Sequence, residues 1–196
     1  EELTLVRPFC KLPLPKMREL EELESGSFHL DSEQGFQLNC LFFHRPEGEP
    51  RNTNTAFLYD GERLVSLCSQ VLPHQRLLRR RNKLGMKPLV EPLEILLALQ
   101  DIKVEGLGDE TEQAYLTLSD IQQQVLGRRS QDLEDAVDGL ADQEDLIGKI
   151  RLSLMDAQRD IRFLVRLPSM SKRYRKLAAE MLLDIDSLMP HNDFLS

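Results

Sequence analysis

Carboxylates are the residues of this chain whose number and spacing could do chemistry. They gather in three stretches, namely Glu19, Glu21, Glu22 and Glu24; Asp109, Glu110 and Glu112; and the seven within 132–145. Hard divalent cations such as Mg²⁺ take oxygen ligands and keep several waters, so one or two carboxylates are enough for a site. An acidic helix face that is only solvated has the same composition. Both interpretations stay open on the residues alone.

No arrangement typical of an active site accompanies these carboxylates. The histidines (His29, His44, His74 and His191) have no histidine four residues away and no cysteine at metal-ligand spacing. This favours surface or strand-edge positions for them. The sequence contains no Gly-x-Ser-x-Gly, no glycine-rich phosphate loop and no His-Glu-x-x-His. We therefore predict that the protein is not an enzyme.

The composition restricts the partners and the compartment. A formal net charge of −8 excludes a dominant basic face, so we predict no nucleic-acid partner. The three cysteines (Cys10, Cys40 and Cys68) are far apart and are expected to be reduced thiols. No apolar run is long enough for a membrane span, and no signal peptide opens the chain. The missing initiator Met predicts that both ends are cuts in a longer protein.

The first 90 residues predict a small antiparallel or mixed sheet flanked by helices. Pro15–Leu23 has helical spacing, Gly35 supplies a turn, residues 45–54 form a polar connection, and Asp60-Gly61 is a hairpin signal. The predicted strands are Ser27–Leu30, Phe36–His44, Thr55–Tyr59 and Leu64–Cys68.

From Pro73 onward the pattern is helical. Pro73 opens a basic helix that reaches Lys83, and Pro92 opens a long helix in which Gly106 and Gly108 indicate a local break. Its expected core positions are Leu93, Leu96, Leu97, Leu118, Ile121 and Val125.

A second long helix is predicted from an N-cap at Ser130 to the proline at 168, with roughly 37 residues and a length of about 55 Å. Its apolar stripe is Leu133, Val137, Leu140, Ile147, Ile150, Leu154, Ile161 and Leu164. A third helix starts around 169–171 and should kink or end at Pro190. Its apolar stripe is Tyr174, Leu177, Met181, Ile185 and Leu188.

Two segments are specific enough to suggest a family. Lys149–Arg166, read as K-I-R-L-S-L-M-D-A-Q-R-D-I-R-F-L-V-R, closely resembles a helix of the proteobacterial CorA magnesium/cobalt transporters. Asp184–Asp193, read as D-I-D-S-L-M-P-H-N-D, resembles the stretch that leads into their pore helix. Asn54–Leu67 and Arg18–Glu24 are similar to the family's strand hairpin and to its acidic helix. The signature Gly-Met-Asn and the two membrane helices of the family are absent from the chain.

The resemblance implies an α+β fold in three parts. Residues 1–90 would form a small α/β sandwich that lacks the family's first strands, residues 91–168 a long antiparallel helix pair, and residues 169–196 the start of a stalk helix. The implied function is a cytoplasmic, Mg²⁺-sensing regulatory domain of a homopentameric channel for Mg²⁺ and Co²⁺ in the bacterial inner membrane. The membrane would be reached only through C-terminal helices outside this chain. The alternative is a non-transport helical scaffold or adaptor built from 93–189.

The resemblance also implies a regulatory metal site between neighbouring chains. Glu21 and Glu22 match the family's acidic pair on the early helix. Asp184 matches the acidic stalk residue best, and a gap in the match leaves Glu180 as the alternative. The ion would be Mg²⁺, regulatory and transported, with Co²⁺ or Ni²⁺ as alternatives. These four residues could also simply screen one another in water.

Overall fold

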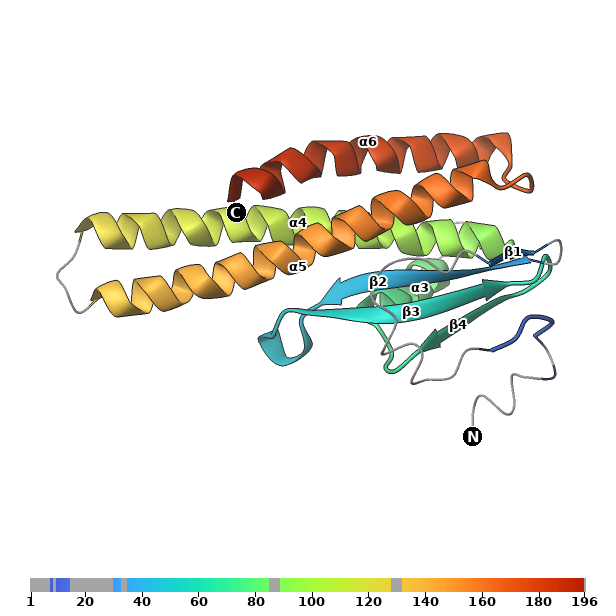
Figure 1. The fold of residues 1–196 in the computed structure, drawn as a ribbon, viewed down its shortest axis with the longest axis horizontal. Coiled ribbons are helices and arrows are strands. Elements are labelled where there is room, and N and C mark those ends of the chain that lie inside the picture. Colours follow the sequence, from blue (N-terminus) through green and yellow to red (C-terminus); the bar gives the residue numbers. More distant parts are fainter. Residues whose placement is uncertain are drawn as a thin grey trace.

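The computed structural model describes residues 8, 10–14, 30–32, 35–84, 89–127 and 132–195. The strands are β1 (Leu30–Ser32), β2 (Gly35–His44), β3 (Arg51–Tyr59) and β4 (Leu64–Cys68), with a short 3₁₀ helix at Pro46–Gly48. The helices are α3 (Pro73–Lys83), α4 (Pro92–Gly127), α5 (Asp132–Arg166) and α6 (Lys172–Leu195). The sheet lies against one half of a layer of three long helices (Figure 1). This is the predicted α+β class.

The sheet is an antiparallel meander in the order β1-β2-β3-β4. β2 and β3 pair from Phe36 opposite Tyr59 to His44 opposite Arg51, so β3 begins four residues earlier than predicted. Polar residues enter this strand because they find partners: the Asn52 amide donates to the carbonyl of Lys149 on α5 at 2.9 Å.

Both turns of the sheet depend on local residue chemistry. At the predicted hairpin, Asp60 Oδ1 accepts the backbone N–H groups of Glu62 and Arg63 at 3.0 and 2.8 Å. Gly35, predicted as a turn, is instead the first residue of β2 and has φ of +146°. A Cβ there would lie 1.9 Å from the carbonyl oxygen of Tyr59, so only glycine fits. Of the predicted first strand, Leu30 belongs to β1 and the rest lies outside the described residues.

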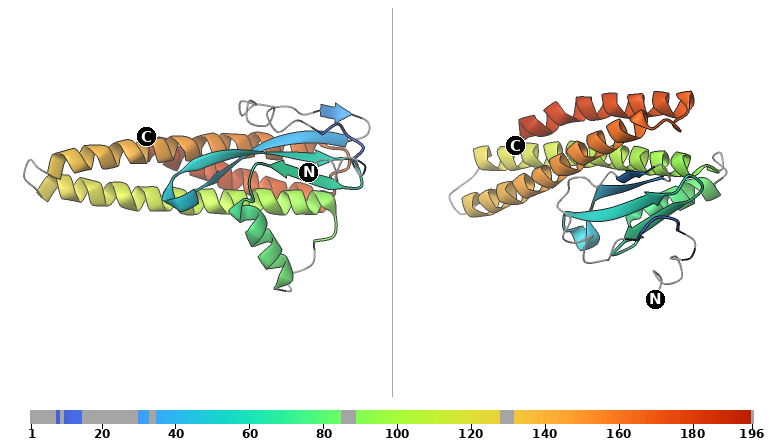
Figure 2. Two further views of the ribbon diagram at one scale, coloured as in Figure 1. Left: turned by 90° about the horizontal axis from the view of Figure 1, so that it is seen from below. Right: turned by 45° about the vertical axis from the view of Figure 1, so that its right-hand side comes forward.

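The long helices α4 and α5 form an antiparallel hairpin, and α6 returns along both (Figures 1 and 2). α4 runs unbroken through Gly106 and Gly108, contrary to the predicted break. The neighbouring Val104 and Leu107 are buried in the core, and their packing outweighs the low helix propensity of glycine. The predicted N-cap Ser130 lies outside the described residues.

The predicted apolar stripes are buried only where the layers overlap. Leu96 and Leu97 on α4 and Ile150, Leu154 and Ile161 on α5 are at most 1% exposed. Towards the tip of the hairpin, the predicted core residues Val125, Val137 and Leu140 are 42%, 58% and 44% exposed. The hairpin extends beyond both the sheet and α6 (Figure 1), and two helices alone cannot cover their apolar stripes.

α6 is anchored to the end of α5 at its start and continues past its proline. At its start, Arg175 donates to the backbone carbonyls of Val165, Leu167 and Met170, which lie around the end of α5 and have few partners within the helix. At its end, α6 continues past Pro190 to Leu195 and therefore does not end at the proline. Within the described ranges, none of the helices has an apolar stretch long enough to cross a membrane.

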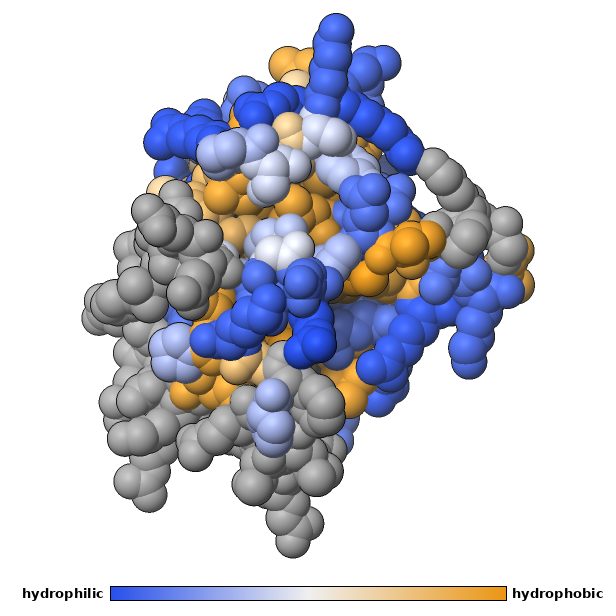
Figure 3. Space-filling model, turned by 90° about the vertical axis from the view of Figure 1, so that its right-hand side faces the viewer, coloured by the Kyte–Doolittle hydropathy of each residue, from blue (hydrophilic) through white to orange (hydrophobic). Residues whose placement is uncertain are grey.

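α3 projects sideways from the body next to the first half of α4 (Figure 2). None of its residues is buried. A cleft separates it from β4 and the beginning of α4, and the cleft is lined mainly by Phe57, Leu64, Leu78, Leu89, Ile95 and Leu99. Figure 3, which looks onto the end of the molecule where α5 turns into α6, shows apolar side chains surrounded by hydrophilic ones.

A buried ion pair joins the helix hairpin to the sheet. Lys103 Nζ on α4 donates to Asp156 Oδ2 on α5 at 2.8 Å, and both side chains are at most 3% exposed. The same carboxylate oxygen accepts the backbone N–H of Leu41 at 2.6 Å, while Ser153 Oγ donates to the carbonyl of Leu41 at 2.9 Å. α5 thus satisfies both backbone groups of Leu41 that β3 leaves unpaired.

A second carboxyl, Asp160, lies one turn further along α5 and is fully buried. Its Oδ2 is 4.0 Å from Lys103 Nζ and accepts a hydrogen bond from the Gln100 amide at 3.4 Å. Burial raises the pKa of Asp160 to about 8, and the charge of Asp156 adds to the increase. Burial lowers the pKa of Lys103, but the attraction of Asp156 and Asp160 outweighs this and raises it. Arg159, whose side chain is one-third exposed, is a second cation beside both carboxyls, since it pairs with Asp156 and lies 3.8 Å from Asp160.

Replacing Lys103 with Met is expected to lower the free energy of unfolding by about 3–5 kcal/mol, because Asp156 then loses its buried cation and keeps only the partly exposed Arg159 as a charged partner. The matched control is Lys149→Met on α5, whose pair with Asp145 is at the surface and should contribute less than about 1 kcal/mol. Urea unfolding followed by circular dichroism measures both. Equal losses in the two variants would contradict the role of the buried pair.

Asp160 should make the protein less stable as the pH rises. In the unfolded chain its carboxyl ionises near pKa 3.8, whereas the folded protein keeps the proton up to about 8. The stability that protonated Asp160 contributes to the fold is therefore complete below the pKa of the unfolded chain. It is lost between the unfolded and the folded pKa, by at most about 1.4 kcal/mol per pH unit. Asp160→Asn keeps the shape without the ionisation, so its stability should vary less between about pH 5 and about pH 8. Parallel pH profiles for the two proteins would rule out this titration.

Candidate cation-binding face

Two of the four predicted metal ligands lie on α6. Glu180 and Asp184 are one helical turn apart, and both are exposed. Glu180 Oε1 is 3.6 Å from Lys176 Nζ, an exposed pair that contributes little energy. Among the described residues, Asp184 has no hydrogen bond or ion pair, so its carboxylate remains available to a ligand.

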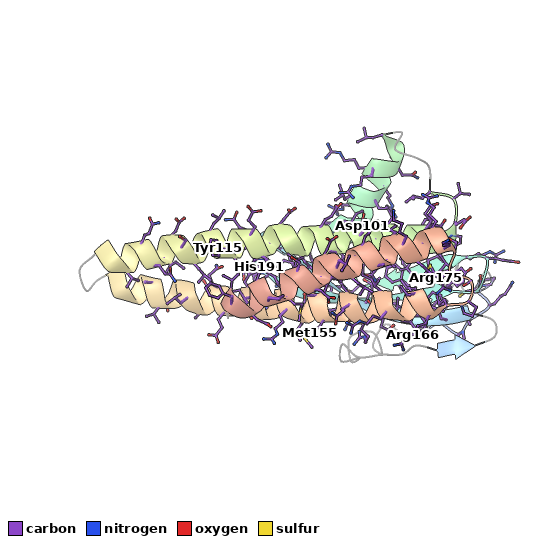
Figure 4. The ribbon with its side chains drawn as sticks, turned by 90° about the horizontal axis from the view of Figure 1, so that it is seen from above. Asp101, Tyr115, Met155, Arg166, Arg175 and His191 are labelled. Carbon is purple, nitrogen blue, oxygen red and sulfur yellow. The ribbon has the colours of Figure 1, made fainter. Side chains whose placement is uncertain are left out.

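Helix packing brings a further carboxylate towards Asp184. This is Asp101 of α4, which is half-buried and which Figure 4 labels near the place where α3 leaves the body. Burial raises the pKa of Asp101, and the negative charges of Glu105 and Asp184 raise it further, while Arg81 opposes them. The proton is therefore held more tightly than on an ordinary aspartate, because the carboxyl is half-buried and because like charges meet at the contact between α4 and α6.

We call Asp101, Glu105, Glu180 and Asp184 the acidic face. Glu105 Oε2 accepts a hydrogen bond from Arg81 Nη2 at 2.6 Å, and Glu180 pairs with Lys176, so two of the four carboxylates have a basic partner. Asp101 and Asp184 have no such partner among the described residues. A divalent cation near both would relieve their repulsion, and Mg²⁺ suits an open position of this kind because it keeps most of its waters.

Sequence reasoning missed Asp101 and Glu105. The only signal is their spacing of four residues, in a stretch of α4 that also contains the polar Gln100 and Lys103. That spacing places them on one side of α4, but which element covers that side depends on how α6 packs.

The remaining predicted ligands, Glu21 and Glu22, lie outside the described residues. Across the part of the chain that the structure describes, no group of three or more His, Cys, Asp or Glu side chains is arranged to hold a metal ion. One chain thus brings Asp101 and Asp184 together without a complete set of ligands from the described residues.

The other residues with reactive side chains serve the packing. His44 ends β2 and is buried, contrary to a surface position, because its Nε2 contacts Thr53 Oγ1 at 2.8 Å. Burial lowers the pKa of His74 to about 4, and its ring packs edge-on against Phe42. All three cysteines are free thiols, as predicted, and burial raises the pKa of Cys40 well above its usual value.

Comparison with known proteins finds relatives that are named as magnesium transport proteins. It is 36% identical to the magnesium transport protein CorA of Pectobacterium atrosepticum over 179 residues, which are 90% of this chain and 57% of that protein. It is 33% identical to the magnesium transport protein CorA of Mannheimia succiniciproducens over 197 residues, covering all of this chain and 62% of that protein. The chain therefore spans less than two thirds of these relatives. No protein-family model matches it.

Solved structures share the fold. The soluble domain of CorA from Methanocaldococcus jannaschii matches with a TM-score of 0.70 at 14% identity, over 85% of this chain and 67% of that one. The ZntB cytoplasmic domain from Vibrio parahaemolyticus matches with a TM-score of 0.69 at 13% identity, over 98% of this chain and 79% of that one. Together with the sequence matches, this confirms the resemblance: the chain belongs with the CorA magnesium transport proteins and corresponds to 57–62% of the length of these two relatives.

Proposed function

We propose that the chain is the cytoplasmic, Mg²⁺-sensing regulatory part of a CorA-type channel for divalent cations. Mg²⁺ would be both the regulatory and the transported ion, with Co²⁺ or Ni²⁺ as further cargo. The full protein would be a homopentamer in the bacterial inner membrane. The names of the relatives support magnesium transport. The observation that carries the sensing role is the exposed Asp184 beside the half-buried Asp101.

The proposed mechanism is a linkage between ion binding and assembly. Asp101 and Asp184 supply one side of a site, and Glu21 and Glu22 of a neighbouring copy supply the other. An ion that bridges carboxylates across an interface stabilises the arrangement that holds them together. When the ion leaves, the carboxylates repel one another and that arrangement loses stability.

A helical scaffold or adaptor is the second candidate. It is favoured by the apolar side chains exposed on the distal hairpin, which offer contact area to a partner helix. They are Tyr115, Leu116, Val125, Val137 and Leu140. This function needs no cation, so the response to Mg²⁺ distinguishes it from the sensor.

Mg²⁺ is expected to raise the melting temperature of the assembled protein, by an amount that corresponds to about 2.7 kcal/mol at a concentration 100 times the Kd. Asp184→Ala and Glu22→Ala should each remove most of this increment, because each deletes one side of the site. The matched control is Asp142→Ala, an exposed carboxylate on α5 without a described partner. Calorimetric titration with Mg²⁺ checks the same variants. If Asp142→Ala lowers the increment as much as Asp184→Ala, cations bind diffusely and the assignment is wrong.

Asp101→Asn should have effects of opposite sign with and without Mg²⁺. In the absence of the ion the variant should melt higher than the wild type, because repulsion from Glu105 and Asp184 is removed. With saturating Mg²⁺ the order should reverse, since one ligand is lost. Melting curves in EDTA and in Mg²⁺ decide this. A variant that is less stable in both conditions would show that Asp101 serves only the packing of α4.

A further inference from the structure

α3 is a basic helix that the fold leaves exposed. Its five positive residues are Arg76, Arg79, Arg80, Arg81 and Lys83. It projects from the body beside α4, on the same side as Asp101 (Figure 4). Within the single chain most of this positive charge is exposed, because none of the helix is buried and the sheet does not cover it.

Three of the positive residues form an unpaired stripe. Arg76, Arg80 and Lys83 follow one another at intervals of four and three residues, so they lie on one side of the helix. None of them has an ion pair among the described residues. Leu77 and Leu84, which flank this stripe, are 38% and 70% exposed. The surface therefore presents positive charge next to apolar area.

α3 borders the acidic face through Arg81, which lies on the side of the helix towards α4 and not in the stripe. Arg81, one residue beyond Arg80, is bonded to Glu105, and its charge reaches Asp101. Anything that docks against Asp101 and Asp184 consequently comes within reach of α3. In the site proposed above, the docking group is an acidic stretch of a second copy. Alone, the carboxylates of that stretch would meet the carboxylates of the acidic face and be repelled.

We propose that α3 is an electrostatic clamp for Glu19–Glu24 of a second copy of this chain. This rests on the proposed function, which brings that segment to Asp184. The segment holds four glutamates and two leucines in six residues, which complement the basic stripe and its flanking leucines. Glu21 and Glu22 share the cation, whereas Glu19 and Glu24 pair with the arginines. The clamp holds without metal and weakens with salt, because its ion pairs are exposed.

An anionic membrane is a poorer fit for the same helix. The chain carries a net charge of −8, and the acidic face adjoins α3, so an anionic bilayer would repel the surroundings of the stripe. A short acidic segment can contact the stripe without covering those surroundings.

The test is sedimentation velocity of the full chain in EDTA at low and high salt. Arg76→Glu with Arg80→Glu should raise the dissociation constant of self-association about tenfold at low salt, the effect of two reversed pairs. The matched control is Arg162→Glu with Arg166→Glu on α5, which reverses the charge of two exposed arginines; Figure 4 shows Arg166 on the side of the molecule away from α3. Adding Glu19→Lys and Glu24→Lys to the α3 variant should restore association by exchanging the two charges.

The outcomes separate the clamp from the cation sensor. Rescue by the charge exchange supports the clamp, and an α3 variant that associates like the control overturns it. An α3 variant that associates normally but loses binding to phosphatidylserine vesicles also overturns it, in favour of a membrane. If Mg²⁺ changes the self-association of none of the variants while the charge exchange still rescues association, the clamp stands and the sensing proposal fails. If Mg²⁺ promotes assembly equally with and without the α3 substitutions, sensing stands and the clamp fails.

Discussion

The arrangement of the whole chain depends on the buried pair between Lys103 and Asp156. The pair fixes α4 and α5 to each other, and Asp156 also accepts the N–H of Leu41, which fixes both helices to the sheet. An uncompensated charge in this position would be very costly, so the rotation and register of both helices have little freedom. Asp101 and Glu105 stand two residues on either side of Lys103, about 200° around the helix. Directing Lys103 to the sheet therefore turns these two carboxylates outward, towards α6 and α3.

This geometry gives α4 two polar groups of opposite electrostatic character: an inner group around Lys103 and an outer group, which is the acidic face. The inner group is mostly buried: Lys103 faces Asp156 and Asp160, the pKa of Asp160 is raised, and the partly exposed Arg159 pairs with Asp156. The outer group is partly solvated and unbalanced, with two carboxylates on α4 and two on α6 against Arg81 of α3 and Lys176 of α6. An ion that binds at the outer group acts on the spacing of α4 and α6. The inner group resists the transmission of that change to the sheet, so a response is expected in α6 before it is expected in α4 or α5.

The parts of the fold that follow from local chemistry could be predicted. Pro73 and Lys83 bound α3, Leu64–Cys68 form β4, Asp60-Gly61 makes the hairpin, and the prolines at 92 and 168 bracket the long helices. The failures come from residues whose environment is set by distant partners. Gln100, Lys103 and Asp160 are fully buried, although a polarity pattern reads such residues as solvent-facing. The prediction that Val137 and Leu140 are core residues fails in the opposite way, because periodicity shows which side of a helix is apolar but not what covers it. Among the site residues, Asp184 was predicted from the family resemblance, whereas identifying Asp101 required knowledge of how α6 packs.

The distal hairpin shows how the same two helices change character beyond the sheet. In 104–127 and 132–148 there is no lysine or arginine, whereas both stretches carry several carboxylates. Here the helices share only a narrow apolar seam, and parts of it are exposed, as at Leu116 and Leu140. Like charges along both outer surfaces oppose close packing, and in the described part of the two helices Lys149, which pairs with Asp145, offsets one of them. The seam is therefore weakest where the negative charge is greatest. Free cations in solution should consequently favour the closed hairpin through screening alone, and a specific site near Asp184 has to be distinguished from this general effect.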